Sequence, residues 1–157
     1  MKFKIQQVAL CPLDVKRAEA LLAKLGLDSW ARDTVVATGT VHGVEGSNRA
    51  QLAFNYDALD GNELELLHYT DGRNWMADTR PAVSHLGMHC TEDELAEWKK
   101  FFELEGIGIV QEVYTQSHTN KFLRDNGRKY HYCIFGTRDV LGTDLKFIVR
   151  IDPAEPR

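Results

Sequence analysis

The sequence has few of the features that mark secreted, membrane-spanning or disulfide-stabilised proteins. It contains three cysteines in 157 residues, and this odd number of widely spaced thiols in apolar stretches predicts reduced, buried side chains in a reducing compartment. No apolar run approaches the roughly 18 residues of a membrane span. The N-terminal stretch also lacks the apolar segment and cleavage site of a signal peptide. We therefore expect a cytoplasmic protein without a membrane partner.

Several chemical signatures are missing as well. The 19 basic and 23 acidic residues are mixed along the chain, so the net charge of −4 is spread out and gives no basic patch for nucleic acid. The sequence has no C-x-x-C pair, no phosphate-binding glycine loop and no dinucleotide fingerprint. These absences argue against a zinc-ribbon, nucleotide-dependent or nucleic-acid-binding protein, and they leave a small-molecule ligand as the expected partner.

The apolar pattern of the first half predicts one strand, one helix and three further strands. Asp14 is a good N-cap, apolar residues then recur at helical spacing, and Gly26 is placed to end the helix. Turn residues separate the strand-like runs. The predicted strands lie at 2–11, 34–43, 49–56 and 62–69.

The second half repeats this βαβββ order. Thr91 and Glu94 form a capping-box signature, which predicts a helix that begins after His89. The run "VSHLGMHC" is therefore expected to be a strand, in which His85 and His89 point to the same face. Further predicted strands cover 107–116, 130–137 and 143–151, with a polar loop at 117–129. The fold class is thus α+β, in one domain of two repeated halves.

These features resemble the vicinal oxygen chelate superfamily, which includes glyoxalase I, bleomycin-resistance proteins and extradiol dioxygenases. The resemblance rests on "IQQVALCPLDVKRAEALLAKLGL" and "VSHLGMHCTEDELAEWKKFFELEGI" as module openings, and on "LELLHY" and "GTDLKFIVRI" as module closings. It implies paired half-barrel sheets, with module 1 at about 3–70, a connection at about 71–81 and module 2 at about 82–152. It also implies a homodimer.

The resemblance further implies a divalent metal (Zn, Ni, Mn or Fe) held by side chains from the first and last strands of each module. In this sequence the corresponding positions are Gln7, Glu65, His85 and Lys146. Lysine is a departure from the pattern, because an ammonium cannot ligate a metal and repels one. The remaining set, Gln7, Glu65 and His85, would be an open three-ligand site of the kind that suits a catalytic metal.

With such a site, the expected function is a metal-assisted lyase, isomerase or transferase that acts on a small, oxygen-rich, anionic molecule. Glu65, His89 and Lys146 are the candidate catalytic residues, with His89 as general base and Lys146 as electrostatic partner. Arg150, Lys146 and His131 are candidate substrate-binding residues.

Two other interpretations remain open. Glu65 and Lys146 could form a buried ion pair in a protein without metal, which binds or sequesters a small molecule or a partner in the manner of the bleomycin-resistance proteins. Alternatively, His89 or His131 could join His85 and a carboxylate in an iron(II) site for dioxygenase chemistry.

Overall fold

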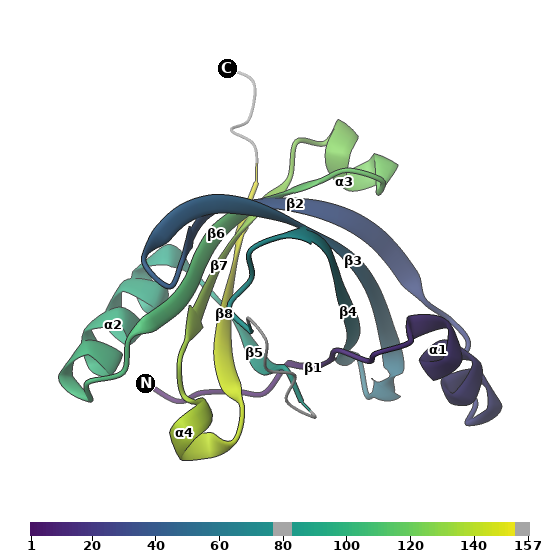
Figure 1. Cartoon of the computed structure of the whole chain (residues 1–157), viewed down its shortest axis with the longest axis horizontal. Helices are drawn as coiled ribbons and strands as arrows, with labels where there is room; N and C mark the ends of the chain where they lie inside the picture. Colours follow the sequence, from purple (N-terminus) through teal and green to yellow (C-terminus); the bar gives the residue numbers. More distant parts are fainter. Residues whose placement is uncertain (77–82, 153–157) are drawn as a thin grey trace.

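The computed structural model describes residues 1–76 and 83–152, which form a single eight-stranded closed barrel with helices outside it (Figure 1). The predicted α+β fold class is confirmed. The first half of the chain contains β1 (Gln7–Leu10), α1 (Val15–Lys24), β2 (Ala31–Val41), β3 (Val44–Leu59) and β4 (Asn62–Gly72). The second half contains β5 (His85–Cys90), α2 (Glu92–Leu104), β6 (Ile109–Ser117), α3 (Lys121–Asp125), β7 (Lys129–Phe135), α4 (Arg138–Leu141) and β8 (Asp144–Ile151).

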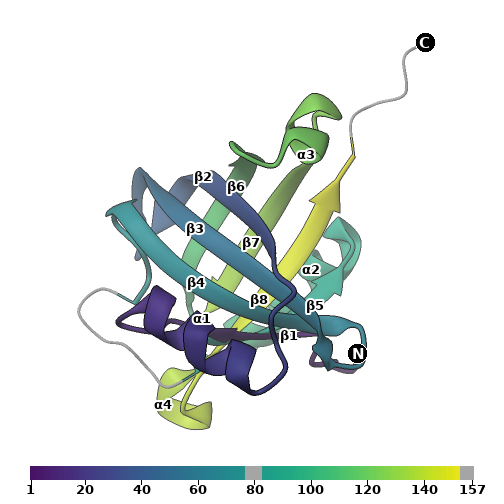
Figure 2. The ribbon, with the colours of Figure 1, turned by 90° about the vertical axis from the view of Figure 1, so that its right-hand side faces the viewer.

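The barrel closes because the two halves pair with each other at both edges (Figure 2). The strand order is β1-β4-β3-β2-β6-β7-β8-β5. Within each half the first and last strands pair in parallel, as β1 with β4 and β5 with β8. Antiparallel pairing of β1 with β5 and of β2 with β6 joins the halves. The first and last strands of both halves are therefore four neighbours, and side chains from all of them meet inside the barrel.

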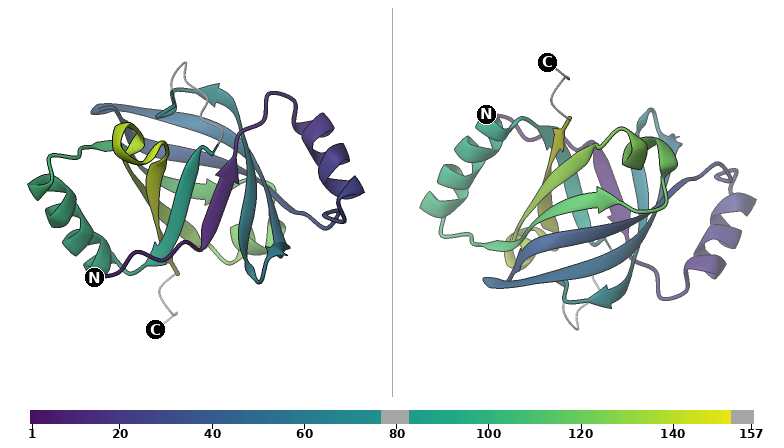
Figure 3. Two further views of the ribbon diagram at one scale, coloured as in Figure 1. Left: turned by 90° about the horizontal axis from the view of Figure 1, so that it is seen from below. Right: turned by 90° about the horizontal axis from the view of Figure 1, so that it is seen from above.

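The two longer helices, α1 and α2, begin where their capping residues predict. Asp14 accepts a hydrogen bond from the backbone N–H of Arg17 at the start of α1, and Thr91 and Glu94 form the predicted capping box at the start of α2. Figure 3 shows the two helices on opposite flanks of the barrel. Helix α2 buries its apolar stripe on the sheet, through Leu95, Trp98 and Phe102.

Strand alternation divides the side chains of β8 between two environments. Leu145, Phe147 and Val149 belong to the apolar core under α2, while Lys146 and Ile148 face the barrel interior. Strand β5 likewise turns His85 and His89 inward, as the capping box at Thr91 indicates.

Two regions differ from the predictions or lie beyond them. The polar segment 117–129, predicted to be a loop, contains the short helix α3, which Asn120 caps by accepting from the backbone N–H of Leu123. Part of the predicted connection between the halves, residues 77–82, lies outside the described residues. Within the ranges that the structure describes, no helix is long and apolar enough to span a membrane.

Candidate functional site

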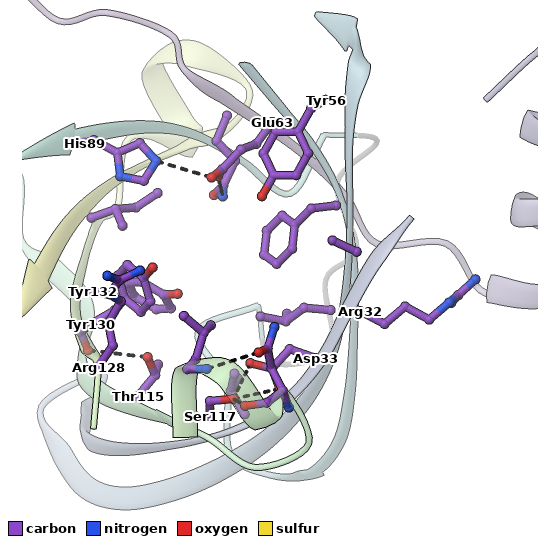
Figure 4. Close-up of a pocket in the computed structure, with 18 residues that line it drawn as sticks. Arg32, Asp33, Tyr56, Glu63, His89, Thr115, Ser117, Arg128, Tyr130 and Tyr132 are labelled. Atoms are coloured by element: carbon purple, nitrogen blue, oxygen red, sulfur yellow. Dashed lines mark hydrogen bonds and ion pairs between the residues drawn. The ribbon is translucent and has the colours of Figure 1, made fainter. Parts of the chain in front are cut away.

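The barrel interior contains two adjacent cavities. The larger cavity, of about 120 Å³, opens towards the end of the barrel covered by α3 and is lined by Gln7, Glu63 and His89 together with side chains from β2, β3, β6, β7 and α3 (Figure 4). The smaller cavity, of about 20 Å³, is lined by Glu65, His85 and Lys146. Thr115 and Tyr132 line both cavities.

The structure brings together the four side chains at the predicted metal-ligand positions. Gln7, Glu65, His85 and Lys146, here called the buried cluster, are each at most 5% exposed. Gln7 Oε1 lies 2.7 Å from His85 Nε2 and 3.3 Å from Lys146 Nζ. Glu65 Oε2 lies 3.2 Å from His85 Nε2 and 3.8 Å from Lys146 Nζ. Neither carboxylate oxygen of Glu65 has a hydrogen bond of ordinary geometry to any described residue.

Strand register explains how these four residues meet. Gln7 and Lys146 are the neighbours of Gly87 on its two sides, because Gly87 pairs with Gln7 across β1 and with Lys146 across β8. A Cβ atom at position 87 would lie 2.9 Å from Gln7 Cβ and 3.1 Å from Gln7 Oε1. The missing side chain at Gly87 therefore leaves the space through which the Gln7 amide reaches the Lys146 ammonium.

Two aromatic rings enclose the buried cluster. The Trp75 ring lies 5.6 Å from the His85 ring, and its Nε1 donates to Asp144. The Lys146 ammonium lies 4.1 Å from the centre of the Tyr132 ring, a cation–π contact. No pattern in the sequence predicts that Trp75 supports His85.

The hydrogen-bond partners fix the protonation of His85. Gln7 Oε1 can only accept, and the Glu65 carboxylate lies 3.2 Å from the same ring nitrogen, so His85 Nε2 carries the proton and Nδ1, 3.3 Å from Ser84 Oγ, is the unprotonated nitrogen. Burial and then the Lys146 charge lower the pKa of His85, which keeps the ring neutral. Burial alone would raise the pKa of Glu65, but Lys146 and His85 outweigh it and hold that pKa below its usual value. The cluster therefore contains one negative charge and one positive charge.

As arranged here, these residues do not fit the divalent metal that the resemblance implies. Gln7, Glu65 and His85 carry atoms that can ligate a metal, and the carboxylate oxygens of Glu65, which lack hydrogen bonds, would be stabilised by a nearby cation. However, the proton on His85 Nε2 faces the other ligands, and the Lys146 ammonium already supplies the positive charge. A divalent ion would lie against this ammonium and repel it. The described residues also contain no group of three histidine, cysteine, aspartate or glutamate side chains arranged to hold a metal.

A second arrangement, in the wall of the larger cavity, escaped the sequence interpretation. Glu63 pairs with Gln7 across β1 and β4, and its carboxylate Oε2 accepts a hydrogen bond of 2.5 Å from Gln7 Nε2. Its other oxygen, Oε1, lies 3.5 Å from Nε2 of His89. The Gln7 amide therefore connects the buried cluster to a carboxylate and a histidine that border the larger cavity, as Figure 4 shows for Glu63 and His89.

The rest of the larger cavity combines aromatic and polar groups. Tyr56 lies on the same side as Glu63, and Tyr130 and Tyr132 lie on a facing wall (Figure 4). Burial, and then the charge of Glu63, raise the pKa of Tyr56, so its hydroxyl keeps its proton and can donate. Arg128 contributes a guanidinium, whose Nε pairs with Asp152.

Two predicted substrate-binding residues lie elsewhere. Arg150 forms an exposed ion pair with Asp152 and lines neither cavity. His131 is on the outer face of β7, where Nδ1 contacts Glu92 and Nε2 lies 2.7 Å from Glu112. His85 lines the smaller cavity, whereas His89 lines the larger cavity and His131 faces α2. The structure therefore places neither His89 nor His131 beside His85 in the two-histidine, one-carboxylate set considered for iron.

Comparisons with solved structures extend over almost the whole chain at low sequence identity. A hypothetical protein from Bacillus halodurans C-125 matches with a TM-score of 0.53 and 12% identity, covering 98% of each chain. Methylmalonyl-CoA epimerase from Streptomyces coelicolor matches with a TM-score of 0.52 and 15% identity, covering 93% of this chain and 96% of the other. A methylmalonyl-CoA epimerase in complex with methylmalonyl-CoA and NH4+ has a TM-score of 0.51 at 15% identity and covers 93% of both chains. No family model and no curated protein matches the sequence.

Proposed function

This chain has the fold of the vicinal oxygen chelate superfamily, and from that premise we propose that it is an enzyme of the lyase or isomerase class. Its substrate would be a small, oxygen-rich, anionic molecule bound in the larger cavity. The chemical step would be a proton transfer at a carbon beside a carbonyl group. Glu63 and His89 would move the proton, in place of the metal-centred set that the resemblance implies.

The position of Glu63 carries this proposal. Its carboxylate borders the cavity, is held by Gln7 on one oxygen and faces His89 on the other. A base must lie within reach of the substrate and be held in one orientation, and distances near 3.5 Å commonly shorten when substrate binds. Glu63 would take a proton from the substrate carbon, whose bonding electrons remain on the substrate as an enolate. His89 would return a proton to the carbon.

Other cavity residues would bind the substrate and its developing charge. The protonated hydroxyl of Tyr56 is a donor for the enolate oxygen. Arg128 supplies a positive charge for an anionic group of the substrate. It takes the role that the sequence interpretation gave to Arg150. The epimerases of this fold whose complexes contain methylmalonyl-CoA or a nitronate analogue are consistent with an acyl substrate.

The test is hydrogen exchange at carbon. The protein would be incubated in D2O with 2-oxo acids, 3-oxo acids and malonyl-type thioesters, and deuterium uptake followed by proton NMR. We expect exchange of at least one class, and a loss of roughly 100-fold or more in Glu63→Gln, the range for removing a general base. Glu97→Gln on the exposed face of α2 is the matched control and should exchange like the wild type.

A second candidate is a binding protein without catalysis. The observation in its favour is that the buried cluster is already balanced in charge and that aromatic rings line much of the larger cavity. In that case ligands would bind without exchange, and Glu63→Gln would leave their affinity within about threefold of the wild type, a change of under 1 kcal/mol.

A further inference from the structure

The Lys146 ammonium lies inside the barrel, among groups that attract a positive charge. Gln7 Oε1 accepts from this ammonium at 3.3 Å, and Glu65 Oε2 lies at 3.8 Å. The face of Tyr132 covers it at 4.1 Å. A neutral oxygen, a charged oxygen and a π face are three groups that each attract positive charge. The His85 ring completes the shell through its contacts with Gln7 and Glu65.

We infer that the buried cluster is a cation site whose occupant is the chain's own Lys146 ammonium, and that shortening Lys146 converts it into a site for an exchangeable divalent metal ion. The inference concerns the barrel centre and its readout is metal binding. It therefore stands or falls independently of the proton transfer proposed for Glu63 and His89.

The bonding of Glu65 supports this inference over an ordinary structural ion pair. Buried carboxylates in structural pairs normally have their oxygens satisfied by hydrogen bonds. Glu65 is fully buried, yet both of its oxygens lack a hydrogen bond of good geometry to the described residues. It is held to Lys146 by charge at 3.8 Å, beyond the length of a close hydrogen bond. A carboxylate in this state keeps lone pairs that a metal ion can use.

The other donor atoms can also turn to a metal. Gln7 Oε1 would gain a metal in place of the Lys146 N–H. For His85 to ligate through Nε2, its proton must move to Nδ1, which lies 3.3 Å from Ser84 Oγ, a possible acceptor. Ser84 is itself fully buried, so this second hydrogen bond is held in place. Removal of the ammonium also removes the positive charge that would repel a metal within the cluster.

The experiment compares metal binding by the wild-type protein and two variants. Lys146→Ala removes the ammonium, and Lys146→Glu replaces it with a fourth ligand. Zn2+ and Mn2+ would be titrated into each protein by calorimetry, with bound metal counted by elemental analysis after dialysis. His85→Ala introduced into each variant is the matched control, because it deletes one donor and leaves surface sites unchanged.

We expect one equivalent of Zn2+ bound by either variant at least roughly 100-fold more tightly than by the wild type, because a buried like charge has been removed. This binding should disappear when His85→Ala is added. A variant that folds only when Zn2+ is present, by circular dichroism, supports the inference equally.

Three results would overturn it. The wild type could bind Zn2+ as tightly as the variants do, in a manner that depends on His85, which would mean that the ammonium does not occupy the cation position. Both variants could be folded and bind no metal, which would mean that the cluster is no cation site. Both could also fail to fold with or without Zn2+, in which case Lys146 is purely structural.

Discussion

Glutamate, histidine and lysine side chains form two clusters in this protein, and the pKa of the histidine is shifted in opposite directions in the two. One lies inside the barrel and the other on its outer face beneath the start of α2, where Glu92 joins it. The inner cluster contains Glu65, His85 and Lys146, and the outer cluster contains Glu92, Lys99, Glu112 and His131. Comparing them shows what decides the charge of a histidine in this fold.

The histidines differ in how many carboxylates they face. His85 contacts one carboxylate, Glu65, and lies near the Lys146 ammonium; burial and then the Lys146 charge lower its pKa and outweigh Glu65 and Asp144, which raise it. His131 faces two carboxylates. Burial opposes its charge, but Glu112 and Glu92 outweigh burial and raise its pKa. The hydrogen bond from His131 is also the main reason that the pKa of Glu112 falls to about 2.

Charge balance accounts for both outcomes. With neutral His85, the inner cluster has one negative and one positive charge. With protonated His131, the outer cluster has two of each sign. In each case the pKa of the histidine shifts towards the state that brings the cluster to zero net charge, because a nearby opposite charge favours the charged form and a nearby like charge disfavours it. A neighbouring glutamate alone therefore does not determine whether a histidine is charged, because every nearby ionisable group contributes.

The strongest way to break this balance is to remove one inner charge. Glu65→Gln leaves the Lys146 ammonium buried beside an amide, and we expect it to lower the free energy of unfolding by about 3–5 kcal/mol, the usual cost of an uncompensated buried charge. Urea denaturation followed by circular dichroism at pH 7 measures this. If the unpaired Lys146 ammonium causes this loss, adding Lys146→Met to Glu65→Gln should recover most of the stability. A free energy of unfolding for Glu65→Gln within about 1 kcal/mol of wild type would contradict the charge balance proposed for the inner cluster.

The outer histidine should give a smaller effect that depends on pH. We expect His131→Gln to cost about 1–2 kcal/mol at pH 5.5, reduced by the partial exposure of Glu92 and Glu112. The pKa of His131 is raised in the folded state, so its stabilisation is complete below its ordinary value of 6.5 and is lost as pH rises through the raised pKa. Unfolding curves of both proteins between pH 5 and 9 should therefore converge at the alkaline end. A difference that grows with pH would contradict a protonated His131.

The inner histidine provides the opposite pH dependence. Because the folded pKa of His85 is lowered, the unfolded chain binds the extra proton first, and stability falls as pH drops below 6.5. Two-dimensional NMR of the imidazole groups can follow both residues at once. We expect His85 to keep the neutral Nε2–H form to a pH below 6.5, and His131 to lose its proton only at a pH above 6.5. Equal titration midpoints would remove the distinction between the clusters.

Period-two alternation made much of the inner cluster predictable. Because the capping box at Thr91 ends the strand after "VSHLGMHC", His85 had to lie in β5, and the apolar neighbours of Glu65 and Lys146 fixed which face these two occupy. The fold class is confirmed, and solved structures that include methylmalonyl-CoA epimerases share this fold at low sequence identity. The module bounds, the homodimer and the cytoplasmic location stay predictions.

The remaining features depended on contacts that the sequence does not display. Glu63 gains its role from pairing with Gln7, 56 residues away, and the Trp75 ring meets His85 only because the barrel closes. His131 was misplaced for a different reason. Strand β7 is apolar or aromatic on both faces, as buried Cys133 and Phe135 alternate with Tyr132 and Ile134, so alternation alone could not say which face is interior.

The smallest expected effect concerns Lys99, the outer counterpart of Lys146. Its side chain is 34% exposed and its partner Glu112 is 26% exposed, against 6% and 1% for Lys146 and Glu65. Lys99→Met should therefore cost at most about 1 kcal/mol, and raising NaCl from 0.05 M to 1 M should reduce even this, because salt screens exposed pairs. Lys146→Met should cost several times more and change little with salt. Urea unfolding of both variants at the two salt concentrations measures these differences in the free energy of unfolding. If both variants depended equally on salt, water would reach Lys146 and the inner cluster would not be closed to solvent.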